Sequence, residues 1–365
     1  MPATSSSAHE ALRREFATFG ESVRRRAPLY ATLSQLVADD DSNNLIALLD
    51  SAPPTQRRPV LLFAAIHDLV LEHSSSDLAR HYPSVGTPTA NADDLARDAA
   101  AFCAEHADAI RDIVAHRHTQ TNDISRSAIL RLACAVKHHH SPLHLIDIGC
   151  SGGLNLYFDE YFATYHAEDG SWSSSAGLPG APQLSCGVRS NIPVDLEVGT
   201  VVNRVGFDPK PIDIFDDTAS RWLRACIWPD QLDRLERLDE AITWARRRDH
   251  SVQTADALAA LDEVELVPPD AHPLIVNSWV LSYLTAEDRV AYRNRIDDIG
   301  RSRDLTWIYL EQPSTTAELE HPVNIAATAR DDITSVTRID WLSGARTVQH
   351  LGVMHPHGYW FHPRL

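Results

Sequence analysis

Four groups of residues in the second half of the chain have the types and positions needed to bind a small polar ligand. The first is the glycine-rich turn Gly149-Cys150-Ser151-Gly152-Gly153, which follows a short apolar run that carries Asp147. The other three follow later apolar runs and are Asp208, Asp256 and the segment Asn277-Ser278-Trp279. Glycines let a ligand approach the backbone closely, and a helix that begins after such a turn directs its N-terminus at the ligand. A carboxylate at a strand end can accept hydrogen bonds from both hydroxyls of a ribose.

The pattern around these residues indicates how the chain would bring them together. Residues 143–148 read as a strand, and residues 154–165 follow with the apolar spacing of a helix. Beyond the glycine-rich turn, strand-like and helix-like segments alternate, which predicts a parallel sheet with helical crossovers. Ligands of open α/β sheets bind at the carboxyl ends of the strands, so we expect all four groups at one edge of the sheet.

The spacing from Asp147 to Gly153, D-x-G-x-S-x-G, resembles the D/E-x-G-x-G-x-G loop of class I S-adenosylmethionine (SAM) methyltransferases. Ser151 stands at the position of the middle glycine. The resemblance implies SAM as cofactor and implies a place for each candidate residue. Asp208 would bind the ribose, Asp256 would read the adenine amino group, and Asn277 would lie where donor and acceptor meet. The residues implied around the cofactor are Asp147, Gly149, Cys150, Ser151, Gly152, Gly153, Asn155, Asp208, Asp256 and Asn277, and those implied beside the methyl acceptor are Asn277, Trp279 and Tyr283.

The choice of ribose-binding acid rests on position rather than on distance along the chain. Such an acid usually follows the glycine-rich loop by about 20 residues. Asp169 has that spacing but lies in a loop rich in serine and glycine, from Glu168 to Pro182. Asp208 ends an apolar run, so we favour it and treat the intervening residues as an insertion. The alternative is that Asp208 is only a turn residue before Pro209.

The same turn also supports a different chemistry. Gly149-Cys150-Ser151-Gly152-Gly153 reads as G-x-S-x-G, the nucleophile elbow of serine hydrolases. A nucleophilic Ser151 would need histidine and acidic partners from elsewhere in the fold. The acids after the later strands suit an adenosyl ligand better, so we favour methyl transfer over hydrolysis.

A second resemblance covers nearly the whole chain. The segments QRRP, HDL, YPSVG, HTQTN, DIGCSGGLNL, RWLRACIWPDQ and GYWFHP are similar to those of an uncharacterised bacterial family, a domain of unknown function. That family combines a helical N-terminal part with a SAM-methyltransferase-like core. The resemblance implies a fold and a cofactor and supplies no reaction.

The chain is expected to form two domains. Residues 1–140 show helical spacing throughout and predict a helical cap, whereas residues 141–365 predict a SAM-binding methyltransferase-like domain. The fold class is α/β, with a Rossmann-like seven-stranded sheet. Residues 333–365 contain two strand-like runs separated by Ser343-Gly344, which predicts an antiparallel C-terminal hairpin.

Composition excludes several classes of protein. The chain has 365 residues, 44% of them apolar, which suffices for a large core, and no apolar run reaches the length of a membrane helix. The formal net charge of −17 argues against a nucleic-acid partner. The first residues lack the features of a signal peptide, and five cysteines without paired spacing suit reduced thiols, so we expect a cytoplasmic protein. Cys103 and Cys134 are expected in the core, whereas Cys150 is a candidate reactive thiol.

Several side chains are candidates for proton transfer or for binding an anionic acceptor. His67, His118 and Tyr283 are the candidate bases, although His67 lies on an apolar helical face and also suits a core position. Arg57, Arg58 and Arg126 are candidate carboxylate clamps. His355 and His357 share a strand-like face, but no acid or cysteine stands beside them at a known zinc spacing, so no metal is predicted.

The sequence therefore predicts a SAM-dependent methyltransferase that acts on an oxygen or nitrogen of a small polar or anionic metabolite. Two alternatives remain open. One is a SAM-binding protein without catalysis, and the other is a non-methylating enzyme that depends on a metal or a serine. The sequence carries no signal for an oligomeric state.

Overall fold

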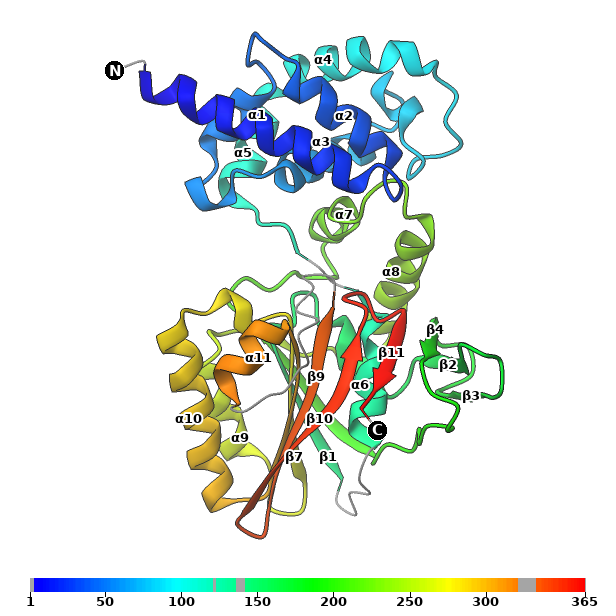
Figure 1. Cartoon of the computed structure of the whole chain (residues 1–365), viewed down its shortest axis with the longest axis vertical. Coiled ribbons are helices and arrows are strands. Elements are labelled where there is room, and N and C mark those ends of the chain that lie inside the picture. The colour runs from blue at the N-terminus through cyan, green and yellow to red at the C-terminus, as the bar shows by residue number, and fades with distance from the viewer. Residues whose placement is uncertain (1–2, 121–122, 136–141, 321–332, 365) are drawn as a thin grey trace. The chain divides into compact units, whose positions relative to one another are not determined.

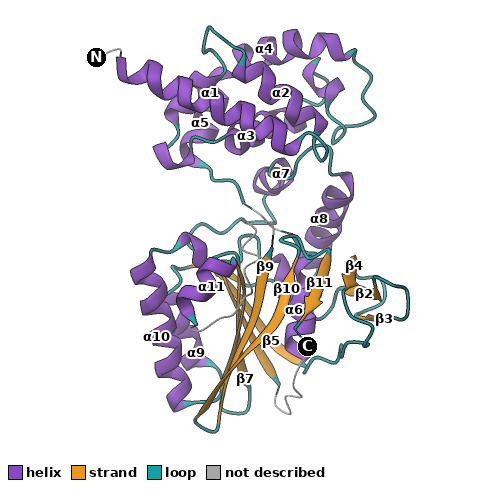
Figure 2. Cartoon of the chain, viewed as in Figure 1, coloured by secondary structure: helices purple, strands orange, loops and turns teal. Residues whose placement is uncertain are grey.

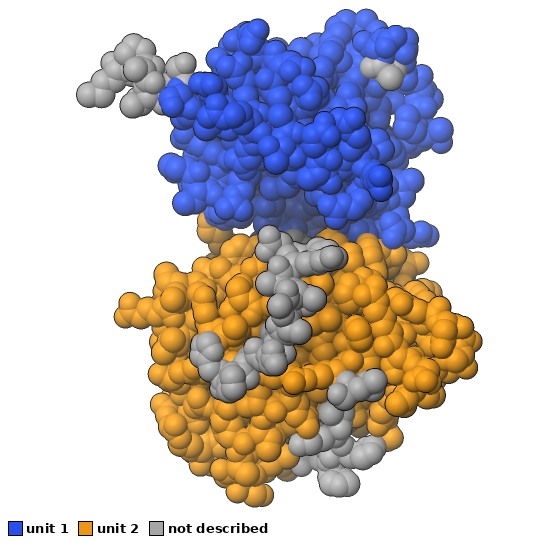
Figure 3. Space-filling view, viewed as in Figure 1, with its two compact units in different colours: residues 1–121, 215–236 blue, residues 122–214, 237–365 orange. Residues whose placement is uncertain are grey.

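A computed structural model describes residues 3–120, 123–135, 142–320 and 333–364 (Figure 1). By its internal contacts the chain divides into two compact units (Figure 3). Unit 1 comprises residues 1–121 and 215–236, and unit 2 comprises residues 122–214 and 237–365. This division differs from a single boundary at residue 140, because residues 122–140 group with unit 2 and residues 215–236 group with unit 1.

Unit 1 is helical. Every regular element within residues 3–120 and 215–225 is a helix (Figure 2). Helix α3 is its centre, because eleven of its residues, from Pro59 to Val70, are buried and it packs on the helices around it. Pro28 and Pro59 begin α2 and α3, where the missing N–H of proline costs no hydrogen bond. The longer helices are α1 (Ala3–Val23), α2 (Pro28–Ala38), α3 (Pro59–Glu72), α4 (Leu95–Glu105), α5 (Ala107–His116) and α7 (Asp217–Ala225). Helix α8 (Leu232–Ala245) begins in unit 1 and ends in unit 2.

Five consecutive strands of unit 2 are parallel and position the candidate site. They lie in the order β6-β5-β1-β7-β8. The strand order reverses between β1 and β7, because the chain first adds β5 and β6 on one side of β1 and then continues on the other. Such a switch point is where open α/β sheets bind ligands. The strands are β1 (Leu143–Ile148), β5 (Val201–Asp208), β6 (Val252–Thr254), β7 (His272–Ser278) and β8 (Leu305–Glu311).

Within the described residues the sheet has eleven strands, so the prediction of seven is wrong. The additional strands come partly from residues 162–188, which the sequence predicts as the end of a helix followed by a loop. Only residues 154–157 form a short 3₁₀ helix, η5, before β2 begins. Tyr165 favours the strand, because its hydroxyl reaches the buried Ala128 carbonyl from β2 and aromatic residues suit a half-buried strand. The strands are β2 (Phe162–Ala167), β3 (Ser173–Ala176) and β4 (Gln183–Val188).

The C-terminal hairpin forms as predicted. Strand β9 (Thr334–Leu342) pairs antiparallel with β8 and with β10 (Ala345–Met354). Ser343 and Gly344 join the hairpin with φ angles of 51° and 78°, which are those of a type I′ turn. Strand β11 (Trp360–Pro363) then pairs with β10 and with β4, so the strands β2 to β4 join the same sheet.

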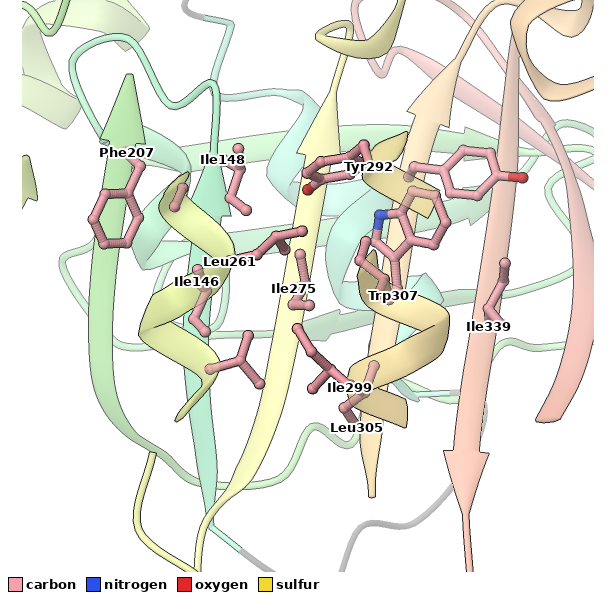
Figure 4. Packing of buried hydrophobic residues seen from close by; sticks show 14 of the residues in the cluster. Ile146, Ile148, Phe207, Leu261, Ile275, Tyr292, Ile299, Leu305, Trp307 and Ile339 are labelled. Carbon is pink, nitrogen blue, oxygen red and sulfur yellow. The ribbon is translucent and has the colours of Figure 1, made fainter. Parts of the chain in front are cut away.

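One face of the parallel strands carries the main apolar core of unit 2 (Figure 4). Apolar residues of β1, β5, β7, β8 and β9 pack there against three helical segments, η6 (Ala259–Asp262), α9 (Glu263–Leu266) and α10 (Ala286–Ser302). All residues of β1 and β8 are buried, as expected for central strands covered on both faces. Gly300 of α10 is required by this packing, because a Cβ atom there would lie 2.3 Å from the Trp341 ring.

Helix α6 (Arg126–Ala135) is buried along its whole length. All ten residues are buried, and the helix contacts β4, β8, β9 and η5. Its last carbonyl groups cannot reach water, so they need partners inside the protein. Arg338 of β9 supplies them, because its Nη1 donates to the carbonyls of Ala133 and Cys134 at 3.0 and 2.9 Å. The guanidinium is paired with Asp340 at 3.0 Å, and both side chains are fully buried.

This buried pair generates a stability prediction. Replacing Asp340 by alanine leaves the Arg338 charge unpaired in the interior, so we expect Asp340→Ala to lower the free energy of unfolding by about 3–5 kcal/mol in urea denaturation. Asp298→Ala is the matched control, because it removes the carboxylate from the exposed Asp298–Arg301 pair and should change little. Equal effects of the two variants would contradict the assignment.

Candidate functional site

The glycine-rich turn joins the end of β1 to η5 and is fixed to the end of β5. The N–H groups of Gly149 and Cys150 both donate to the carbonyl of Phe207, at 2.7 and 3.1 Å. Gly149, Ser151 and Gly153 have φ angles of 82°, 55° and 67°. Glycine adopts positive φ angles without strain. Ser151 has a side chain, so its positive φ angle costs conformational energy and is uncommon for a residue other than glycine.

Two of the glycines are required by the protein's own packing. A Cβ atom on Gly149 would lie 2.2 Å from Cγ2 of Val280. A Cβ atom on Gly153 would lie 2.5 Å from Cγ2 of Val252 and 2.8 Å from Cε1 of His250. These glycines therefore serve the conformation and packing of the turn, and their presence is not by itself a sign of a bound ligand.

Asp208 ends β5, as predicted, and its carboxylate faces the glycine-rich turn. Oδ2 accepts the Ser151 N–H at 2.9 Å, and Oδ1 accepts the Lys210 N–H at 2.8 Å. A carboxylate has about four acceptor positions, so a partly exposed one can bind ligand hydroxyls as well. Asp169 lies instead in the exposed turn between β2 and β3, at the opposite end of the strand order from β5. Its carboxylate accepts the Ser171 N–H.

Burial decides the protonation of Asp147 and the reactivity of Cys150. Burial, together with the neighbouring charge of Asp208, raises the pKa of Asp147 to about 7. Burial also raises the pKa of the Cys150 thiol well above its usual value, and both acids add to this effect. The thiol therefore stays protonated, which contradicts a reactive role. Cys103 and Cys134 are buried, as predicted.

Asp256 and Asn155 make local hydrogen bonds. Asp256 follows β6 and is exposed, and its Oδ1 accepts the N–H groups of Leu258 and Ala259, both at 2.9 Å. It thereby caps the short helix η6. Asn155 lies in η5, where its Oδ1 accepts the hydroxyl of Ser127 at 2.7 Å, so it joins η5 to the first turn of α6.

Asn277 has a structural role, because its side chain is buried and cannot contact a ligand. Its exposed fraction is 0%. The amide Nδ2 donates to the carbonyl of Ile148 at 3.0 Å, and Oδ1 accepts from the Tyr292 hydroxyl at 3.1 Å and from the Trp307 indole at 2.7 Å. These bonds connect the end of β7 to the end of β1, to α10 and to β8, and they leave no exposed atom to touch a methyl acceptor.

Trp279 follows β7 with a φ angle of 58°, and a residue that the sequence did not single out supports this turn. Glu311 ends β8, and its Oε1 accepts the N–H groups of Val280 and Leu281 at 2.7 and 2.8 Å. Its Oε2 is buried without a hydrogen-bond partner in the described part of the chain. Burial raises the pKa of Glu311 to about 7, although the hydrogen bonds and the Arg126 charge oppose this. In the sequence, the position of Glu311 at the end of an apolar run could have indicated a residue at a strand end.

Arg126, at the start of α6, joins three parts of unit 2. Its Nη1 donates to the Ser278 hydroxyl at 3.2 Å, and its Nε donates to the carbonyl of Pro356 at 2.8 Å. Its guanidinium carbon lies 5.7 Å from the centre of the Trp279 ring. Arg126 therefore belongs to the edge that carries the carboxyl ends of the strands, within unit 2.

His355 and His357 lie in the loop between β10 and β11, with their rings 5.5 Å apart. Nδ1 of His357 is 3.0 Å from Oδ2 of the buried Asp123, just before α6. Nδ1 of His355 accepts the N–H of His357 at 3.1 Å. Within the described ranges, no group of three or more histidine, cysteine, aspartate and glutamate residues is placed to hold a metal ion.

Two of the three candidate bases, His67 and His118, belong to unit 1. His67 is a buried residue of unit 1, with Nδ1 3.1 Å from the Ala225 carbonyl and Nε2 2.7 Å from the Ser84 hydroxyl. Burial lowers its pKa to about 4, so the ring is neutral near pH 7 and has the surroundings of a core histidine. His118 also belongs to unit 1, and its carbonyl accepts the Trp222 indole N–H at 3.1 Å.

The remaining candidates are on surfaces or in loops. Tyr283 follows β7 and is 81% exposed. Arg57 donates to the carbonyls of Ala52 and Asp50 at 3.0 and 2.8 Å, and Arg58 is exposed before α3. Arg57 and Arg58 belong to unit 1, whereas Arg126 belongs to unit 2 and contacts Ser278 at the carboxyl end of β7.

Comparison with known proteins establishes the family. Residues 13–362 match the family described as "Uncharacterized protein conserved in bacteria (DUF2332)", so the chain belongs to that family. A search of the curated proteins finds no match. Across the described residues, no helix is long and apolar enough to cross a membrane.

The two buried carboxyl groups generate a pH prediction. Between about pH 4 and 7 the folded protein keeps protons on Asp147 and Glu311 that the unfolded chain releases, so the free energy of unfolding falls as the pH rises, by up to about 1.4 kcal/mol per pH unit for each group. Asp147→Asn mimics the protonated form, and we expect its urea stability to fall less than that of the wild type between pH 5 and 7.5.

Asp169→Asn is the control, because it alters an exposed carboxyl group in a turn and should leave the wild-type fall in place. If Asp147→Asn lost as much stability over this pH range as the wild type, Asp147 would not be the buried group that titrates.

Proposed function

We propose that unit 2 binds SAM at the carboxyl ends of β1, β5 and β7 and transfers its methyl group to an oxygen or nitrogen of a small polar or anionic metabolite. The observation that carries the proposal is the position of Asp208, which ends the strand beside β1 and contacts the glycine-rich turn at 2.9 Å. In a sheet of this strand order, a carboxylate there faces the place where a ribose would lie next to the turn.

The hydrogen-bonding groups around the turn are suited to an adenosyl ligand. Asp208 is half-buried, and its carboxylate accepts the backbone N–H groups of Ser151 and Lys210. A carboxylate has further acceptor positions, so it can also accept ribose hydroxyls. The turn itself is rigid, because Phe207 accepts two of its N–H groups and Ile212 donates to the Ser151 carbonyl at 3.2 Å. A preformed site of this kind binds without an ordering cost.

Bound SAM would supply an activated methyl group, so the protein needs mainly to align donor and acceptor and to exclude water. Ser278 ends β7 and Trp279 follows it, so both lie at the carboxyl end of this strand, where the Ser278 hydroxyl accepts from Arg126 and the Trp279 indole donates to Thr334. Buried hydrogen bonds support the backbone on either side of them, because Asn277 donates to the Ile148 carbonyl and Glu311 accepts the N–H groups of Val280 and Leu281.

One observation favours serine-dependent hydrolysis as a second candidate function. Ser151 has a φ angle of 55° in a turn after a strand, and a strained serine in such a turn is also the feature of a nucleophile elbow. The two functions differ in what they ask of Ser151. A transferase needs only its backbone, whereas a hydrolase needs its hydroxyl oxygen.

A third candidate is a SAM-binding protein without turnover. The exposure of two predicted catalytic residues supports it. Asn277 is fully buried and Tyr283 is 81% exposed, so neither forms an enclosed acceptor site by itself. Formation of S-adenosylhomocysteine from SAM separates this candidate from a methyltransferase.

Calorimetric titration tests the ligand. We expect S-adenosylhomocysteine to bind with a micromolar dissociation constant, about −8 kcal/mol, and Asp208→Asn to weaken binding at least about tenfold because an amide nitrogen cannot accept a hydroxyl. Asp169→Asn is the matched control and should bind like the wild type. Loss of binding in Asp169→Asn with normal binding in Asp208→Asn would show that the wrong acid was chosen, and no binding by the wild type would reject the proposal.

Substitution of Ser151 separates transferase from hydrolase. We expect Ser151→Ala and Ser151→Gly to keep S-adenosylhomocysteine binding within about threefold of the wild type and to keep methyl transfer from SAM, because only the backbone of the turn is used. Glycine also suits the positive φ angle, so Ser151→Gly should unfold at a temperature no lower than the wild type. A Ser151→Ala protein that binds normally but loses all turnover would instead support the nucleophile.

A further inference from the structure

We propose that Asp123 and His357 form a general-base dyad that removes a proton from the methyl acceptor. The inference rests on the proposed function and deepens it. It assigns the acceptor to compounds that must lose a proton during transfer, such as a hydroxyl compound or an amine, rather than to carboxylates that are already ionised at neutral pH.

The dyad consists of one buried and one partly exposed side chain. Asp123 is 3% exposed at its side chain and His357 is 26% exposed. Oδ2 of Asp123 lies 3.0 Å from Nδ1 of His357, and Oδ1 accepts the N–H of Ser125 at 3.1 Å. The contact is within ion-pair distance but does not have the alignment of a hydrogen bond. A carboxylate this close to Nδ1 favours a proton on that nitrogen and leaves Nε2 to accept the proton of a substrate. Such contacts often align fully only when substrate is bound.

The protein holds this dyad at the same edge as the switch point. Gly358, next to His357, has a φ angle of 75°, and a Cβ atom there would lie 2.4 Å from the Ser125 carbonyl. The loop therefore packs directly on the start of α6. Arg126 continues the connection, because it bonds to the Pro356 carbonyl and to the Ser278 hydroxyl at the end of β7.

The other end of this connection is the glycine-rich turn. The Ser127 hydroxyl donates to Asn155 of η5, which follows the turn. The first turn of α6 thus contacts the segment after the glycines, the end of β7 and the loop that carries His357. The dyad is therefore connected through Arg126 to the end of β7, and through Ser127 to the segment after the glycine-rich turn.

Several titratable and charged groups surround His357. Asp123 and Arg126 come from the segment that begins α6, and His355 and Tyr359 come from the same loop. Arg237 of α8 lies over the Tyr359 ring at 5.9 Å. Asp123 is the negative group in direct contact, so it is the group expected to stabilise the protonated ring.

In the proposed step, a lone pair of the acceptor oxygen or nitrogen forms the bond to the methyl carbon. The acceptor proton passes to Nε2 of His357, and the electron pair of the broken carbon–sulfur bond stays on sulfur, which leaves S-adenosylhomocysteine. The positive charge lost by sulfur appears on the imidazolium, which the Asp123 carboxylate then stabilises.

The pairing is tested first without turnover. NMR titration of the full-length protein with labelled histidine follows the His357 ring, which is identified by its loss in His357→Gln. We expect the titration midpoint of His357 to move to lower pH by about one unit in Asp123→Asn, because the carboxylate no longer stabilises the imidazolium. An unchanged midpoint would overturn the dyad.

The role in transfer is tested with radiolabelled SAM and the deproteinised small-molecule fraction of bacterial cells as the acceptor source. We expect His357→Gln to transfer at least about 100-fold more slowly at pH 7 and to bind S-adenosylhomocysteine within about twofold of the wild type. His362→Gln is the control, because it changes an exposed histidine of β11 and should transfer normally. In Asp123→Asn the rise of the rate with pH should begin at lower pH, and the maximal rate should fall.

The outcomes separate this inference from the proposed function. Normal transfer by His357→Gln would overturn the dyad alone. Equal losses of binding and transfer in His357→Gln would show a structural role and would also overturn it. A wild type that does not bind S-adenosylhomocysteine would reject the proposed function itself, and a wild type that binds but transfers nothing would reject both transfer and base.

Discussion

The burial of helix α6 is the constraint on which the rest of unit 2 depends. A ten-residue helix with every residue buried must find internal partners for both of its ends. Arg338, held by the buried Asp340, supplies them at the C-terminal end. The N-terminal end is held by contacts to η5, β7 and the loop before β11. The same contacts gather these three segments at the carboxyl ends of the strands, so the core helix also assembles the candidate site.

Many residues at this edge of the sheet have structural roles, because their side chains bond to or pack against other parts of the protein. The Asn277 amide forms hydrogen bonds with Ile148, Tyr292 and Trp307. Glu311 accepts hydrogen bonds from the backbone after β7. Gly149 and Gly153 leave room for valine side chains. The Ser278 hydroxyl contacts Arg126 and the Trp279 indole donates to Thr334. Asp208 differs from these residues, because its half-buried carboxylate accepts two backbone N–H groups and has further acceptor positions.

The sequence predicted the elements that depend on local pattern and missed those that depend on distant partners. The parallel strands, the turn at Ser343-Gly344 and the strand-end position of Asp208 followed from apolar runs and turn residues. Strands β2 to β4 did not, because Tyr161 and Tyr165 fit a helical spacing as well as a strand and only pairing with β4 decides between them. The sequence did not predict Asp123 and Glu311 as site residues, because their roles depend on burial and on contacts with residues distant in the sequence. His67 was predicted as a candidate base, but its side chain is buried within unit 1.

A crystal structure of the protein with S-adenosylhomocysteine is the most direct test of the central claim. The account predicts that the two ribose hydroxyl oxygens lie within about 3 Å of the Asp208 carboxylate, with the adenosyl sulfur directed towards Ser278 and His357. A ligand bound elsewhere, with Asp208 still bonded only to Ser151 and Lys210, would contradict it.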